Sequence, residues 1–95
     1  MEITVKDINN YLLSKKILPN HKGFRYFRRL IELCLEDENK MYNNLYNLYS
    51  QIANEYDCSI SSIIRNLNYC IETIENKTTI SEFLAISVLT LKGEI

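Results

Sequence analysis

The sequence predicts an all-α domain of five to six helices, and three observations support this fold class. Only two glycines and one proline occur in 95 residues, whereas a β-sandwich or barrel needs turn residues roughly every ten positions. Apolar residues recur at three- and four-residue spacing, the period of an amphipathic helix. Serine or threonine precedes several of these segments, where it can cap a helix. The length suits a single domain over residues 1–95.

The first two predicted helices flank a short connection. A helix over residues 5–14 begins after Thr4, with Asp7 three positions later as a capping box requires. The connection contains Pro19, which excludes a continuous helix. A second helix over residues 23–35 then turns four apolar side chains to one side, namely Phe24, Phe27, Ile31 and Cys34.

The third and fourth predicted helices are the longest. Neither Gly nor Pro interrupts the third, over residues 40–56, although its sequence leaves room for a bend near residues 48–50. Ser59 can cap the fourth, over residues 60–75. This helix has the clearest apolar stripe of the chain, formed by Ile60, Ile63, Ile64, Leu67, Ile71 and Ile74.

The last predicted helix is apolar on more than one side. It follows a second capping box, formed by Thr79 and Glu82, and ends near residue 91. An isolated monomer does not need so much apolar surface on one helix. We therefore expect a homodimer contact through Phe83, Leu84, Val88 and Leu91.

Charge is distributed unevenly along a chain whose net charge is only −1. Most small nucleic-acid-binding domains are more basic than this. Six basic residues nevertheless fall within fifteen positions that hold no acid, namely Lys15, Lys16, Lys22, Arg25, Arg28 and Arg29. Acids follow at Glu32, Glu36, Asp37 and Glu38. The basic segment is either a binding face or the solvated outside of one helix, and the sequence leaves both interpretations open.

Motifs that carry chemistry are scarce. His21 is the only histidine, and no glycine-rich phosphate loop, HExxH or GxSxG occurs. We therefore expect no enzyme, no cofactor and no metal site. The three cysteines form no CxxC pair, which is typical of reduced, buried thiols in a cytoplasmic protein. The sequence has neither a signal peptide nor an apolar run of the roughly 20 residues that a membrane span requires.

Residues 49–75 predict a helix-turn-helix. A helix, a three-residue joint and a second helix follow one another there, and Ala53 is small enough for two helices to cross closely. In such a motif the second helix offers its outer face to the DNA major groove. Asp57 stands where glycine is usual in the turn.

Four stretches of the chain match one family in the same order. Residues 17–31, ILPNHKGFRYFRRLI, are similar to the pattern Val-Pro-x-His-x-Lys-Gly-Tyr-x-Tyr-Leu-Arg, and residues 48–57, LYSQIANEYD, to Leu-Tyr-Pro-Asp-Ile-Ala-Lys-Lys-Phe-Asn. Residues 81–85, SEFLA, are similar to Ser-Glu-Phe-Ile-Ala. The family's helix between the last two of these stretches is matched at Ser61, Arg65, Ile71 and Glu72. The chain thus resembles the C-terminal DNA-binding domain of the stage-zero sporulation master regulator family.

This resemblance implies a helical response-regulator effector domain that binds promoter elements in double-stranded DNA. The receiver domain that precedes it in the family is not within these 95 residues. For base contacts the helix-turn-helix offers Ser62, Arg65, Asn66 and Tyr69. For phosphate contacts we expect Lys22, Arg25, Arg28, Arg29, Ser59 and Ser61.

The chain departs from the family where the family reads bases. Two arginines and a glutamate of the family align with Ser62, Arg65 and Ile64, so that one arginine remains. Residues 50–75 hold one base against four acids, and DNA phosphates repel acids. The family's stretch between the last two helices is shortened to residues 76–80, so a helix of the family is absent there.

These departures leave three hypotheses. The first is a DNA-binding regulator of altered specificity. The second is an interaction module that kept the fold, lost DNA binding and pairs with itself or with the full-length regulator. The third, a helix-turn-helix of the sigma-factor type, leaves the Leu-Pro-Asn-His-Lys-Gly segment of residues 18–23 unexplained.

Overall fold

The computed structural model describes residues 2–74 and 78–95, and these fold into six α-helices without any strand. In chain order they are α1 (Val5–Ser14), α2 (Lys22–Glu36), α3 (Lys40–Asn43), α4 (Leu45–Glu55), α5 (Ile60–Glu72) and α6 (Ile80–Leu91). The all-α prediction is confirmed. Within the described ranges, no helix is long and apolar enough to cross a membrane.

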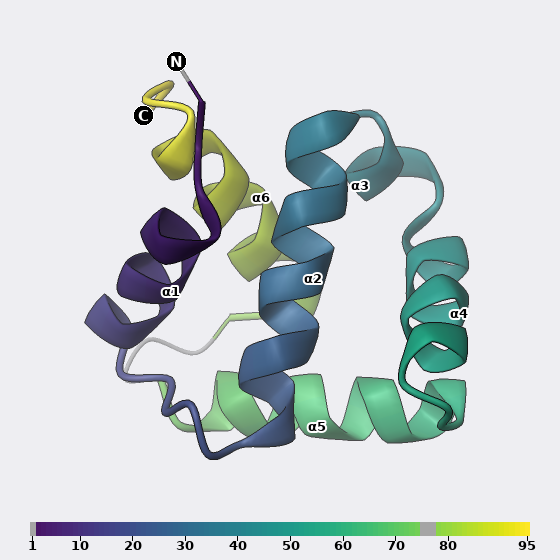
Figure 1. Cartoon of the computed structure of the whole chain (residues 1–95). Coiled ribbons are helices and arrows are strands. Elements are labelled where there is room, and N and C mark those ends of the chain that lie inside the picture. The colour runs from purple at the N-terminus through teal and green to yellow at the C-terminus, as the bar shows by residue number, and fades with distance from the viewer. Residues whose placement is uncertain (1, 75–77) are drawn as a thin grey trace.

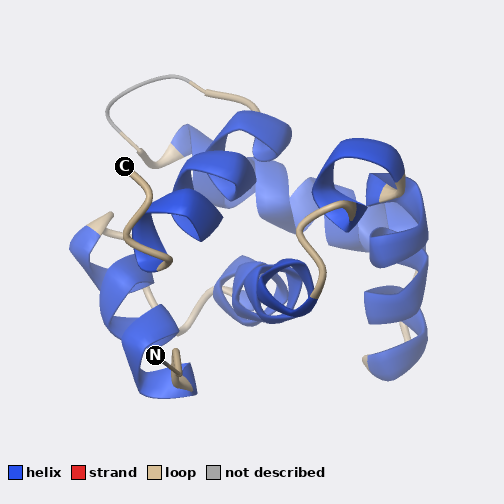
Figure 2. Cartoon of the chain, turned by 90° about the horizontal axis from the view of Figure 1, so that it is seen from above, coloured by secondary structure: helices blue, strands red, loops and turns tan. Residues whose placement is uncertain are grey.

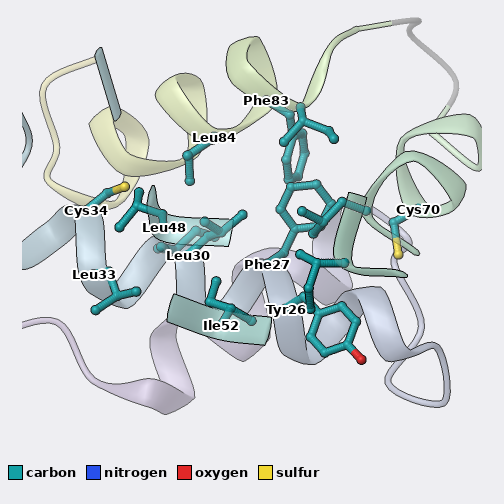
Figure 3. Close-up of a cluster of buried hydrophobic side chains, with 14 of the residues drawn as sticks. Tyr26, Phe27, Leu30, Leu33, Cys34, Leu48, Ile52, Cys70, Phe83 and Leu84 are labelled. Carbon is teal, nitrogen blue, oxygen red and sulfur yellow. The ribbon is translucent and has the colours of Figure 1, made fainter. Parts of the chain in front are cut away.

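Helix α2 is the central element of the fold. It packs against every other helix of the described chain, and Figure 2 shows it end-on with the others around it. Its apolar side is fully buried, at Phe27, Leu30, Ile31 and Cys34. The rings of Phe27 and Phe83 meet edge to face at 5.0 Å between centroids, joining α2 to α6 in the core (Figure 3).

Three of the helices begin at the capping residues that the sequence predicts. The Asp7 amide donates to the Thr4 hydroxyl at 3.2 Å, and the Thr4 amide donates to the Asp7 carboxylate at 2.9 Å. Ser59 accepts from the Ser62 amide at 3.1 Å. Thr79 accepts from the Glu82 amide at 3.1 Å. Each bond satisfies an amide that lacks a partner within its helix.

The third predicted helix is wrong in one respect: the structure divides it at Asn44. The backbone leaves the helical region there, with φ −135° and ψ 34°, while residues 48–50 continue regularly within α4. Asn44 accepts a hydrogen bond from the Asn47 side chain at 3.3 Å. Asparagine favours such breaks because its short amide bonds locally. Met41 of α3 and Leu48 of α4, on either side of the break, are both buried in the core.

The fourth predicted helix ends earlier than expected. Helix α5 stops at Glu72, and the Thr73 hydroxyl donates to the Cys70 carbonyl at 2.7 Å. Residues 75–77, which include the predicted end of this helix, lie outside the described residues.

The predicted dimer surface of the last helix is wrong in its residues. Phe83, Leu84 and Val88 are buried within the monomer, and Leu91 is half-buried. Helix α6 is apolar on several sides because it packs against α1, α2, α3 and α5 at once. The three buried side chains are therefore not available to a second copy, and homodimerisation itself stays a prediction.

Candidate nucleic-acid interface

Helices α4 and α5 and the turn between them occupy the segment for which the sequence predicts a helix-turn-helix. Figure 1 shows α5 running crosswise to α4 at one end of the molecule. Ile52 and Ala53 of α4 and Ile63 and Leu67 of α5 are buried, and the two helices are in contact. Ala53, the small residue that the sequence predicts at the crossing, is buried at the end of α4.

The turn is held in shape by backbone geometry at Asp57. Its φ of 53° lies in the left-handed region, where glycine is the usual residue and Asp or Asn is the next most tolerated. The following amide, that of Cys58, donates to the Ala53 carbonyl at 2.9 Å. The turn therefore forms although it lacks the glycine typical of the motif.

The outward side of α5 carries five exposed residues, and we call this set the α5 outer face. Its members are Ser61, Arg65, Asn68, Tyr69 and Glu72. Positions 61, 65, 68 and 72 follow one another at helical spacing. Sequence reasoning missed Asn68, although that spacing, opposite the apolar stripe, would have identified it.

Two of the four predicted base-contact residues lie beside this face rather than on it. Ser62 and Asn66 are half-buried. The Asn66 amide nitrogen donates to the Ser62 carbonyl at 2.8 Å. Both side chains thus lie on the flank of the helix. Arg65 and Tyr69 instead point outward, Tyr69 with 51% of its surface exposed.

The first turn of α2 lies directly against α5 at Gly23. A Cβ atom there would stand 2.5 Å from the Asn66 carbonyl oxygen and would also overlap the Cys70 sulfur. Immediately before it, the ring of His21 lies 5.1 Å from the ring of Tyr69. The start of α2 is therefore a neighbour of the α5 outer face.

The predicted phosphate-binding arginines of α2 do not form one surface. Lys22 and Arg25 are exposed beside α5, with the Arg25 guanidinium 5.7 Å from the Tyr56 ring centroid. Arg28 instead donates to Asn9 of α1 at 3.3 Å. Arg29 turns toward α4, where it pairs with Glu55. Arg25 and Arg29 thus lie toward the end of α4, whereas Arg28 lies toward α1.

Arg29 and Glu55 form a two-bond ion pair between α2 and α4. The Arg29 Nε and Nη2 atoms donate to the two carboxylate oxygens of Glu55 at 2.9 and 3.0 Å. Gln51 donates to the same carboxylate at 3.2 Å. These bonds hold the pKa of Glu55 below its usual value. The pair braces α4, the first helix of the α4–α5 unit, against the core helix.

The two predicted serine contacts lie at the N-terminus of α5. The Ser59 hydroxyl caps the helix, and its oxygen lies 3.1 Å from that of Ser61. Ser61 is exposed. Helix N-termini carry a partial positive charge, which makes this end of α5 the part of the helix most compatible with a phosphate.

The cysteines contribute packing rather than reactivity. Burial raises the pKa of Cys34 and of Cys70 to about 11, so both thiols stay protonated at neutral pH. Their predicted burial is confirmed. Cys58 differs, since it is half-buried in the turn with its sulfur 3.9 Å from the Tyr26 hydroxyl.

Comparison with known families agrees with the resemblance found in the sequence. The family described as "Sporulation initiation factor Spo0A C terminal" matches residues 8–94, from Ile8 within α1 to beyond the end of α6. A search of curated proteins gives no match to the chain. Because the family match spans nearly the whole sequence, the chain belongs to the family of the Spo0A C-terminal domain, a family of DNA-binding regulatory domains of sporulation.

Proposed function

We propose that this chain binds double-stranded DNA with the α5 outer face in the major groove and regulates transcription with an altered base preference. The observation that carries the proposal is the position of Arg65. It is the only basic residue between positions 50 and 74, and it is exposed at the centre of the outer face. An arginine in this place suits the paired hydrogen bonds that guanine offers in the major groove.

The neighbours of Arg65 supply the remaining base contacts. Asn68 and Tyr69 lie on the same face one turn further along α5. An asparagine amide pairs with adenine, and a tyrosine hydroxyl bonds to a base edge or a phosphate. Ser62 and Asn66 are half-buried beside the outer face, and one donor of the Asn66 amide is bonded to the Ser62 carbonyl, so we assign them contacts at the margin of the helix.

Phosphate binding is assigned to the residues at the junction of α2 and α5. Lys22 and Arg25 are exposed there, and Ser59 and Ser61 mark the start of α5. Arg28 and Arg29 lie about 7.5–9 Å further along the α2 axis than Gly23, at 1.5 Å per residue. Their bonds to Asn9 and Glu55 favour a role in the fold.

The direct test is fluorescence anisotropy with two short duplexes, one carrying the family's promoter element and one a scrambled AT-rich sequence. We expect Arg65→Ala to cost about 1–3 kcal/mol and to relax preference at one base pair. Arg28→Ala removes the same charge from a side chain that faces α1, and serves as the matched control with little effect on affinity.

The results separate three cases. Preference for the promoter element that Arg65→Ala abolishes supports a regulator of inherited specificity. Equal, salt-sensitive binding to both duplexes supports a domain that holds phosphates but reads another sequence. Absence of binding even at low salt contradicts the DNA-binding proposal.

A second candidate is the interaction module, which the acids of the α4–α5 unit favour. Glu72 lies on the α5 outer face itself, and Asp57 is exposed in the turn. Both repel phosphate. A dimer that persists at low protein concentration, together with no salt-sensitive DNA binding, would favour this candidate. Its contact would use exposed residues such as Ile86, which is 49% exposed on α6.

A further inference from the structure

The end of the molecule away from α5 contains a groove that the proposed function does not use. It lies where the N-terminal segment, the end of α2 and the end of α6 converge, and its volume is about 750 Å³. Figure 1 shows both chain termini at this end and α5 at the other. We call it the terminal groove.

The floor of the terminal groove is apolar. Ile3, Leu35 and Leu91 are half-buried there, and Val5 leaves 46% of its surface exposed. These side chains come from three separate segments of the chain and share one hollow. Apolar side chains set among charged ones in an open groove suit an amphipathic partner rather than a purely apolar one.

The rim of the groove is acidic. Four of its lining residues are glutamates, namely Glu2, Glu32, Glu36 and Glu94. The one lysine of the lining, Lys92, donates to Glu38 at 3.0 Å, so that its charge is already matched by a carboxylate outside the lining. The groove therefore combines an apolar floor with an unbalanced negative rim.

We propose that the terminal groove binds a basic amphipathic helix of a protein partner. Leucine-like side chains on one face of such a helix would fill the floor, and lysines or arginines beside them would meet the glutamates. A helix suits this site better than an extended peptide, because the described chain has no sheet edge to pair with a strand. DNA is excluded as the occupant by the negative rim.

The test uses the full chain and three fluorescein-labelled helical peptides of about 14 residues. One places Leu at helical spacing with Lys elsewhere, one replaces Lys by Glu, and one replaces Leu by Ser. We expect fluorescence anisotropy to detect binding of the Leu/Lys peptide alone. Binding of the Ser/Lys peptide with equal affinity would overturn the proposal, because charge alone would then explain the association.

Variants with matched controls locate the site. Glu36→Lys should weaken Leu/Lys binding about fivefold or more, and lysine is compatible with the end of α2 because it favours a helix C-terminus. Glu72→Lys makes the same charge change on α5 and should weaken it much less. Val5→Ser should also weaken binding, whereas Leu18→Ser, in another exposed apolar residue, should not.

Two further outcomes would contradict the proposal. Equal effects of Glu36→Lys and Glu72→Lys would show general electrostatic attraction. Concentration-dependent self-association in sedimentation that Glu36→Lys abolishes would make the occupant a second copy of the chain. Peptide binding at this groove does not require DNA binding, so the two proposals fail independently.

Discussion

Gly23 lies at a position where the fold leaves no room for a side chain. In an ordinary helix, alanine is about 1 kcal/mol better than glycine. Here a Cβ would stand 2.5 Å from the Asn66 carbonyl oxygen, and a backbone atom can move only if α2 and α5 separate. We expect Gly23→Ala to lower the free energy of unfolding by about 1–3 kcal/mol, measured by urea denaturation.

The double variant Gly23→Ala with Cys70→Ala identifies the responsible contact. The added Cβ would also overlap the Cys70 sulfur, and Cys70→Ala removes that atom but leaves the carbonyl of Asn66. We therefore expect the double variant to remain less stable than Cys70→Ala alone. Equal stability of the two would mean that the sulfur, rather than the backbone, excludes the side chain.

The same residue illustrates what the sequence could predict about single positions. The Lys-Gly pair within residues 17–31 carried the family resemblance, yet no local pattern indicated that Gly23 faces α5. That contact joins positions more than forty residues apart and depends on the packing of two helices. Helical spacing placed Arg65 and Tyr69 outward correctly. It did not reveal that Asn66 is half-buried and donates a hydrogen bond to the Ser62 carbonyl within α5.

At the level of elements, local signals predicted helix starts well and failed where packing decides. The capping residues Thr4, Ser59 and Thr79 act within one turn, so the sequence reveals them directly. The break at Asn44 was not revealed by helical spacing, because Met41 and Leu48 are seven positions apart, as in one continuous helix, and both are buried. The basic stripe of α2 likewise divides because α1 and α4 lie on different sides of it.

The ion pair between α2 and α4 should make stability depend on pH. Because the pKa of Glu55 is lowered in the folded protein, the unfolded chain takes up the proton first as the pH falls. The stabilisation is complete above the unfolded value of 4.5 and is lost as the pH falls through the lower folded pKa. Its size is about 0.5–1 kcal/mol for a partly exposed pair.

Glu55→Gln isolates this effect, since glutamine does not titrate. As the pH is lowered from 6 into the acid range, we expect the urea concentration at the unfolding midpoint to decrease less for this variant than for the native chain. Glu72→Gln, which alters an exposed carboxylate on α5, is the matched control and should retain the native pH dependence. If the urea midpoint of Glu55→Gln decreased with falling pH as much as that of the native chain, other carboxylates would be responsible for the acid sensitivity.

For the whole molecule, the two ends differ in charge and in proposed partner. Exposed Lys22, Arg25 and Arg65 lie at the α5 end together with the acids Asp57 and Glu72. At the other end, the glutamates of the terminal groove face one lysine that is already paired. A net charge of −1 hides this separation. Because the groove end repels phosphate, DNA should approach the α5 end, which leaves the groove accessible to a basic partner.

The salt dependence of DNA binding counts the cations that contact phosphate. The logarithm of the binding constant falls with the logarithm of salt concentration with a slope of about −0.9 per phosphate neutralised. If Lys22 and Arg25 alone serve this role, the slope should be about −2. Participation of Arg28 and Arg29 would bring it to roughly −4, because each adds one released counterion. Serine hydroxyls do not change the slope, since they carry no charge.

Anisotropy titrations of the promoter duplex between about 50 and 200 mM salt measure this slope. We expect Lys22→Gln to reduce its magnitude by about one, and Arg29→Gln to leave it unchanged. A loss of slope in Arg29→Gln would mean that DNA draws Arg29 away from Glu55. In that case the ion pair would compete with phosphate, and Glu55→Gln would raise the affinity for every duplex.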